Sequence, residues 1–186
     1  MKTIVLASSG TGKGTAAQLC DKVKDLDTIE FAFLYDKKMY GELGVEELKN
    51  LINGWLANPG NYPKGSIRWN PECPGNYVKA IEGALEGGDT ALLPFIKETF
   101  EMVEQLFKGD DIRRVMVFPE KDNFGEYEEI YKERGNDENF INERRKQFSE
   151  LAKIFDEARG YEKVRLGKRK HLAPELIKRK ICRERG

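Results

Sequence analysis

A glycine-rich segment between an apolar run and an amphipathic one is the strongest constraint on the fold of this 186-residue chain. The segment reads Ser8-Ser9-Gly10-Thr11-Gly12-Lys13-Gly14-Thr15 and directly follows the apolar run Lys2–Ala7. A short apolar run that ends at a turn is typical of a buried strand, and the apolar spacing within Lys13–Lys24 is typical of a helix. The sequence therefore predicts a strand, a tight turn and a helix, which is the setting of a phosphate-binding loop.

Each residue type in this loop suits a polyphosphate ligand. Glycines let the backbone curl so that successive N–H groups point inward, and the start of a helix adds partial positive charge. Lys13 supplies a full charge for the outer phosphates, and the hydroxyl of Thr15 is the expected Mg²⁺ ligand. The expected ligand-binding residues are Ser9, Gly10, Thr11, Gly12, Lys13, Gly14 and Thr15.

The loop departs from the usual pattern at two positions. Ala7 stands where a first glycine is usual, and Gly14 stands where a serine or threonine usually follows the lysine. A glycine-rich turn without a ligand is therefore the alternative interpretation. A Mg²⁺ site often also needs an aspartate at the end of a buried strand. The strand predicted at Thr90–Ile96 has none, so Asp36 and Asp89 are the candidates, and each is also explained as a plain loop carboxylate.

Short apolar runs alternate with amphipathic helices along the whole chain. This alternation predicts an α/β fold of three layers, in which a five-stranded, mainly parallel sheet is covered by helices on both faces. The expected strands are Lys2–Ala7, Thr28–Tyr35, Thr90–Ile96, Ile112–Phe118 and Lys163–Leu166. The expected helices are Lys13–Lys24, Val45–Leu56, Asn76–Leu85, Lys97–Phe107, Glu120–Arg134, Asp137–Arg159 and Pro174–Ile181.

Arginines gather around the break at Gly135 between the two long charged helices. Arginines on a hinged helical pair can close over a triphosphate, where they neutralise the charge of the transferring phosphoryl group and exclude water. The alternative is a pair of surface helices held by salt bridges, which contribute little. The arginines concerned are Arg134, Arg144 and Arg145.

Composition excludes several other classes of protein. No apolar run approaches the roughly 18 residues of a membrane helix, and the apolar stretch near Met1 is too short for a signal peptide. The three cysteines, Cys20, Cys73 and Cys182, match no zinc or redox spacing, which favours reduced thiols in the cytoplasm. His171 is the only histidine, so a catalytic site or metal site rich in histidine is not expected.

Charge is balanced overall, with 32 basic and 32 acidic residues, but it is uneven along the chain. The segment Lys163–Gly186 holds ten basic and two acidic residues. Such a tail can contact nucleic acid, or it can be a solvated helix that faces an acidic body. Because no aromatic residues are interleaved with these charges, the second interpretation is favoured.

Three segments together resemble the nucleoside monophosphate kinases, and guanylate kinases most closely. Gly10–Thr15 is similar to the GxGKGT loop of adenylate kinases and to the related GxGKST loop of guanylate kinases. Gly75-Asn76-Tyr77 is similar to a Gly-Asn-Tyr element whose tyrosine contacts the acceptor phosphate. Arg134-Gly135-Asn136-Asp137, followed by Arg144-Arg145, resembles that family's arginine lid. The stretches Ser66–Tyr77 and Tyr127–Phe140 also resemble nucleotide kinases predicted from phage genomes.

This resemblance implies a single P-loop kinase domain over residues 1–186 that uses ATP and Mg²⁺. It implies an acceptor-binding insertion at about residues 36–76 and an arginine-bearing helical lid at about residues 120–150. Lys13, Arg134 and Arg145 would be catalytic, and Arg144 would contact the nucleotide cofactor. Arg68, Asn76 and Tyr77 would bind the acceptor.

The acceptor end departs from guanylate kinases. Their Ser-x-Thr-Thr-Arg-Pro-x-Arg-x-Gly-Glu stretch is absent, and a loop at 58–75 with four of the seven prolines lies in this part of the chain. In this region Lys64 and Arg68 are suited to hold a monophosphate, and Tyr62 or Trp69 to stack on a base. The aromatic pair is equally explained as the anchor of a long loop.

Three hypotheses for the function follow. The first is phosphoryl transfer from ATP to a nucleoside or deoxynucleoside monophosphate. The second keeps the ATP site but changes the acceptor to another small molecule or a nucleic-acid end. The third is a nucleotide-binding module without catalysis.

Overall fold

The computed structural model describes residues 1–120, 123–133, 135, 138–168 and 170–185. The chain forms two compact units, of which the first joins Met1–Asp25 to Ala84–Gly186 and the second consists of Leu26–Gly83. The second unit is thus inserted into the sequence of the first, directly after Asp25. Within the described parts of the chain, no helix is both long and apolar enough to cross a membrane.

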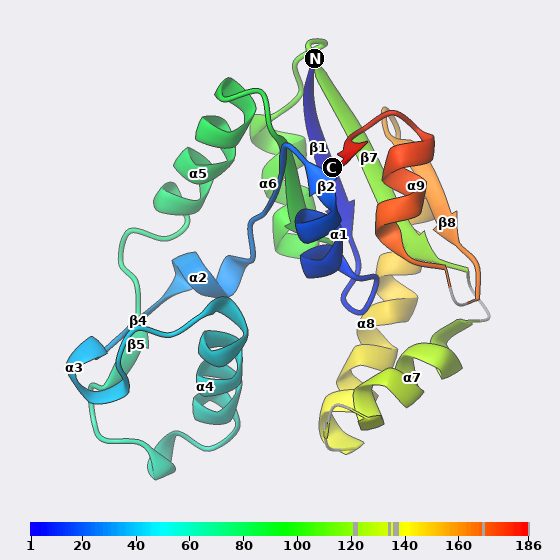
Figure 1. Ribbon diagram of the computed structural model, residues 1–186. Coiled ribbons are helices and arrows are strands. Elements are labelled where there is room, and N and C mark those ends of the chain that lie inside the picture. Colours follow the sequence, from blue (N-terminus) through cyan, green and yellow to red (C-terminus); the bar gives the residue numbers. More distant parts are fainter. Residues whose placement is uncertain (121–122, 134, 136–137, 169, 186) are drawn as a thin grey trace. The chain divides into compact units, whose positions relative to one another are not determined.

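Five parallel strands form the sheet of the first unit in the order β3-β6-β1-β7-β8. Figure 1 shows β7 beside β1 and β8 beside β7. Val5 in the central strand pairs with Leu92 on one side and Val115 on the other. Because all five strands run the same way, their carboxyl ends meet at one edge of the sheet, where open α/β sheets bind ligands. The strands are β1 (Lys2–Ala7), β3 (Val23–Asp25), β6 (Thr90–Pro94), β7 (Ile112–Pro119) and β8 (Glu162–Leu166).

Helices cover both faces of this sheet. Successive residues of each strand point to opposite sides, so each face has apolar side chains on which helices pack. On one face Val5, Val117 and Leu166 pack with Ala16 of α1 (Lys13–Leu19) and with Leu176 of α9 (Leu172–Lys178). Figure 1 shows these two helices on the same side of the sheet. The predicted α/β class, with one parallel sheet between helices, is confirmed.

The opposite face of the sheet is aromatic. The ring of Phe118 in β7 packs against Phe95, at 5.7 Å between ring centroids, and against Phe148 and Phe155, at 4.7 and 5.7 Å. Phe148 and Phe155 belong to α8 (Glu138–Glu157), and Phe95 also contacts Phe100 of α6 (Lys97–Leu106). Among the described residues, α7 (Phe124–Glu133) and the antiparallel pair of β2 (Cys20–Asp21) with β9 (Arg183–Glu184) also belong to this unit.

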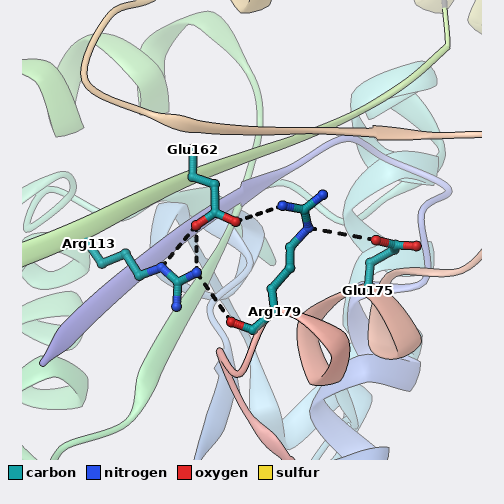
Figure 2. A network of polar contacts seen from close by, with 4 residues as sticks. All are labelled: Arg113, Glu162, Glu175 and Arg179. Atoms are coloured by element: carbon teal, nitrogen blue, oxygen red, sulfur yellow. Dashed lines mark hydrogen bonds and ion pairs between the residues drawn. The ribbon is translucent and has the colours of Figure 1, made fainter.

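A polar network ties β7, β8 and α9 together (Figure 2). The carboxylate of Glu162 accepts hydrogen bonds from Arg113, at 2.5 and 3.1 Å, and from Arg179 at 2.8 Å. Arg113 also donates to the backbone oxygen of Arg179 at 3.3 Å, and Glu175 lies 3.7 Å from the Arg179 side chain. These bonds lower the pKa of Glu162, with Arg113 as the largest cause. The last helix is therefore fastened to the sheet edge by charge as well as by its apolar face.

The second unit has a small core of its own. Phe33, Ile52 and Ile67 are buried in it, and the ring of Phe33 stacks on Trp69 at 4.4 Å and meets Trp55 edge-on at 5.9 Å. A two-stranded antiparallel ladder pairs β4 (Phe33–Tyr35) with β5 (Ile67–Trp69). The helices of this unit are α2 (Thr28–Ala32), α3 (Lys37–Tyr40), α4 (Val45–Ala57), η1 (Pro59–Asn61) and all but the last turn of α5 (Gly75–Glu86).

The strand predicted at Thr28–Tyr35 is confirmed only at Phe33–Tyr35, which pairs with β5 and not with the parallel sheet. The helix predicted at Lys13–Lys24 is too long, because α1 ends at Leu19. Residues 28–32 are helical because the side chain of Asp27 accepts a hydrogen bond from the backbone N–H of Ile29, which caps α2. The second strand of the parallel sheet is instead Val23–Asp25, which follows α1 after the left-handed residue Lys22. The other four predicted sheet strands are confirmed within two residues of their observed ends, and Pro94 ends its strand as expected.

Candidate functional site

The loop that follows β1 leaves the sheet at its carboxyl edge. Ser8 still belongs to the sheet, since its N–H bonds the backbone oxygen of Val117 at 3.3 Å. The hydroxyl of Thr11 then donates to the backbone oxygen of Ser8 at 2.7 Å and closes the turn. The backbone oxygen of Thr11 accepts from Leu172 at 3.1 Å, which links the loop to the start of α9. The loop is therefore fixed at its beginning, at its turn and against a neighbouring helix.

Two glycines of the loop have backbone conformations that other residues rarely adopt. Gly10 has a φ of 83°, and Gly12, which precedes α1, has a φ of 86°. Both angles lie in the left-handed region, where a side chain causes strain. The sequence interpretation of a curled loop that leads into a helix thus agrees with the observed backbone.

Gly10 is also covered by a tyrosine from α7. A β-carbon at residue 10 would lie 2.8 Å from Cδ1 of Tyr127, closer than real contacts allow. One turn later, the hydroxyl of Tyr131 donates to the backbone oxygen of Ser9 at 3.5 Å. Both tyrosines are buried and pack with Ile141 of α8. Sequence reasoning missed them, although their spacing of four residues on an amphipathic helix was visible.

The hydroxyl of Ser8 is an exception among the buried polar groups. Ser8 is only 6% exposed, and within the described parts of the chain its Oγ atom has no hydrogen-bond partner. An unsatisfied buried hydroxyl carries a desolvation penalty of about 1–3 kcal/mol. Such a group at the base of a curled loop is available to a ligand that brings an acceptor or a donor.

The first residues of α1 carry the groups expected to meet phosphate and metal. Lys13 is half-buried and begins the helix, whereas Gly14 and Thr15 are exposed. Close to them lies a carboxylate that sequence reasoning missed: Oδ2 of Asp25, at the end of β3, is 3.9 Å from the point that a β-carbon on Gly14 would occupy. No clear signal marked Asp25, because its strand has three residues, of which only Val23 is buried.

The side chains of the two aspartates considered from the sequence bond other groups. Asp36 belongs to the second unit, where its side chain accepts from the N–H of Lys38 at 2.9 Å and caps α3. Asp89 precedes β6, so it lies at the amino end of that strand, and it pairs with Lys24 at 2.9 Å. Across the described residues, no group of three or more histidine, cysteine, aspartate or glutamate side chains is arranged to hold a metal. A Mg²⁺ ion here would rely on one or two protein oxygens together with phosphate and water.

The predicted arginine lid is described in part. Arg134 lies outside the described residues, together with Asn136 and Asp137 of the same motif. Arg145 bonds Glu128 of α7 at 2.6 Å and Asn142 at 2.7 Å.

The neighbouring arginine of this predicted lid also has partners. Arg144 donates to Gln147 at 2.7 Å and lies over the ring of Phe140 at 4.8 Å. The roles of all three arginines toward a nucleotide stay predictions.

The predicted acceptor residues belong to the second unit. Arg68 is exposed on β5 and lines a cavity of about 260 Å³ with Leu34, Tyr35, Asp36, Gly65 and Ser66. Asn76 donates to the backbone oxygen of Phe31 at 2.9 Å. The hydroxyl of Tyr77 donates to the backbone oxygen of Leu26 at 3.0 Å. The contacts of Asn76 and Tyr77 therefore hold their own unit together, and the binding roles of all three residues stay predictions.

A second cavity, of about 780 Å³, lies at the amino ends of the strands, where Thr3, Thr90 and Arg113 contribute to its wall. It contains none of the loop residues 8–15. Because the loop leaves β1 at the opposite edge of the sheet, the candidate site is defined by the loop and not by the larger hollow.

No protein-family model matches the chain, and no curated protein matches it significantly. The resemblance to nucleoside monophosphate kinases therefore stays a prediction from the sequence.

Proposed function

We propose that this chain is a P-loop kinase that transfers the γ-phosphoryl group of Mg-ATP to a nucleoside or deoxynucleoside monophosphate. One observation supports the proposal above all: the loop after the central strand β1 has two glycines in left-handed conformations and leads directly into α1 with Lys13 at its start. The flanking strands β6 and β7 lie on opposite sides of β1, and this reversal of strand order is where α/β sheets bind nucleotides.

In this proposal the loop supplies binding and charge, and little covalent chemistry is asked of the protein. Backbone N–H groups of residues 9–14 and the ammonium group of Lys13 would hold the phosphates. Thr15 offers a hydroxyl and Asp25 a carboxylate, and oxygen donors of this kind are what Mg²⁺ prefers. Mg²⁺ would neutralise charge on the transferring group, and the arginines of the lid would add to this when they close.

The tyrosines of α7 give the proposal a structural link between loop and lid. Tyr127 touches Gly10 and Tyr131 bonds Ser9, so a movement of α7 is felt directly by the loop backbone. Because Arg145 is paired with Glu128 on α7, the same helix also connects to the arginines. Closure of α7 and α8 would thus act on phosphate binding and on phosphoryl transfer together.

The contacts of the predicted acceptor residues bear on which acceptor is used. The family resemblance assigns Asn76 and Tyr77 to the acceptor. Their side chains, however, donate hydrogen bonds to the backbone oxygens of Phe31 and Leu26. This observation favours the second candidate function, in which the same ATP site serves a different small-molecule or nucleic-acid acceptor. The three cysteines carry free thiols, which suits the reducing cytoplasm proposed for such an enzyme.

An ADP-release assay across all ribonucleoside and deoxyribonucleoside monophosphates tests the proposal. We expect turnover with at least one of them. We expect Lys13→Ala to reduce this turnover about 100-fold or more, because the variant lacks the positive charge that Lys13 would place beside the phosphates. Lys108→Ala, an exposed lysine of the same unit, is the matched control and should leave turnover unchanged. ATP binding without turnover on any acceptor would select the silent binding module instead.

A further inference from the structure

Gly14 stands where phosphate-binding loops usually have a side-chain hydroxyl. In the usual loop the residue after the lysine is a serine or threonine whose hydroxyl binds Mg²⁺. Here that residue has no side chain, and the point where its β-carbon would be lies 3.9 Å from Oδ2 of Asp25. Leaving aside its chain neighbours and its own helix backbone, no other atom of the described residues comes within 4 Å of that point. A carboxylate thus stands beside the place from which the usual hydroxyl would act.

The sheet fixes the position of this carboxylate. Asp25 is the last residue of β3 and pairs with Leu92 in the parallel ladder to β6. The buried side chain of Val23 anchors the strand in the core, and Oδ1 of Asp25 is itself buried. The backbone of Asp25 therefore belongs to the same rigid sheet as the strand that carries the loop.

We propose that Asp25 is the carboxylate that holds the Mg²⁺ ion of a nucleotide bound at this loop, in the role that the hydroxyl at residue 14 usually has. This inference rests on the proposed function, because it requires a nucleotide at the loop. Mg²⁺ is usually bound by one or two carboxylates together with phosphate oxygens and water, so one carboxylate beside the loop is sufficient. Asp89 lies at the amino end of β6, opposite to the end of the sheet that carries the loop, and the side chain of Asp36 caps α3.

Metal binding and nucleotide binding are measured separately to test this. Titration of a fluorescent ATP analogue in EDTA reports the loop alone, and electron paramagnetic resonance of Mn²⁺ in the ternary complex reports the metal. We expect Asp25→Asn to weaken Mn²⁺ binding in the complex by about 10- to 100-fold, as losses of metal-supporting groups do. Binding of the analogue in EDTA should be unchanged or tighter, because a negative charge near the phosphates is removed.

Two further variants make the test specific. Asp89→Asn removes a carboxylate at the amino end of β6 and should leave Mn²⁺ affinity unchanged. Gly14→Ser in the Asp25→Asn background should restore part of the affinity, because the added β-carbon makes only an ordinary contact. Thermal unfolding of each variant checks that the fold is retained.

The outcomes are distinguishable. If Asp25→Asn binds Mn²⁺ as the wild type does while both bind the analogue, the assignment of Asp25 is wrong and the nucleotide loop stands. If the folded wild type binds no analogue with or without Mg²⁺, both the proposed function and this inference are overturned. Recovery of Mn²⁺ affinity on adding Gly14→Ser to Asp25→Asn, together with unchanged affinity in Asp89→Asn, supports a metal-binding role specific to Asp25.

Discussion

The ring of Tyr127 lies against the backbone of Gly10, so that a β-carbon on Gly10 would be 2.8 Å from Cδ1 of the ring. The same glycine has a φ of 83°, so a side chain there is opposed by both a neighbour and the local backbone. The glycine-rich loop and α7 therefore constrain one another at Gly10, where the contact requires a residue without a side chain.

Gly10→Ala should accordingly lower the free energy of unfolding by roughly 1–3 kcal/mol and weaken ATP binding. Gly135→Ala is the matched control, since Gly135 has a similar φ of 78° but no atom of the described residues lies within 4 Å of the added carbon. It should show the cost of the backbone strain alone. Urea unfolding with a nucleotide titration measures both effects, and equal costs in the two variants would show that the Tyr127 contact is unimportant.

The sequence predicted the parts of this fold that depend on local pattern. Lys2–Ala7 and the loop after it are evident because five apolar or small residues run into glycines. Val23–Asp25 could not be found in the same way, since three residues with one buried side chain carry no period. Its assignment comes from the pairing with β6, which is a long-range contact.

The candidate site shows the same division. The identity of the loop residues was predicted because the motif is contiguous. Asp25 and Tyr127 were missed because each meets the loop only through the tertiary fold, Asp25 from an edge strand and Tyr127 from a helix more than a hundred residues away. Nothing in the sequence around either residue specifies what it faces.

Asp27 explains why the segment after it is helical, and its substitution tests that explanation. Its carboxylate caps α2 and also pairs with Lys49 of α4 at 3.1 Å. Asp27→Ala should lower the free energy of unfolding by about 1–2 kcal/mol, because a cap and an ion pair are both lost. Asp27→Asn keeps a capping oxygen and should cost less. Chemical denaturation compares the two, and a larger loss for the asparagine variant would contradict the role as a cap.

Glu162 predicts how stability changes in acid. Its folded-state pKa lies below the usual value because Arg113 and Arg179 bond the ionised form, so it contributes stability above the pKa of the unfolded chain. That contribution is lost as the pH falls below about 4.5 and through the folded-state pKa. Because the side chain is 32% exposed, we expect only about 1 kcal/mol from it.

Glu162→Gln should therefore be less stable than the wild type at pH 7, and this difference should narrow between about pH 4.5 and pH 3. Thermal unfolding across this range measures the convergence. Glu42→Gln is a suitable control, since Glu42 pairs with Lys37 on an exposed surface and its loss should leave the stability nearly unchanged at both pH values. A constant difference between Glu162→Gln and the wild type from pH 7 to pH 3 would show that the carboxylate charge is not what Arg113 and Arg179 stabilise.

Substitution of Arg145 distinguishes a catalytic role of this arginine from a surface salt bridge. Its guanidinium bonds Glu128 at 2.6 Å, but the side chain is 51% exposed, so Arg145→Ala should change the free energy of unfolding by less than about 1 kcal/mol. If Arg145 closes on the transferring phosphoryl group, the same variant should lose about 1,000-fold in turnover, as arginines in this role do. Glu128→Gln breaks the same pair while leaving the arginine in place, so its turnover should stay near the wild-type value. Equal turnover in the two variants would show that Arg145 only links α7 to α8. Either variant breaks the ion pair, but only Arg145→Ala removes the positive charge that would act on the phosphoryl group.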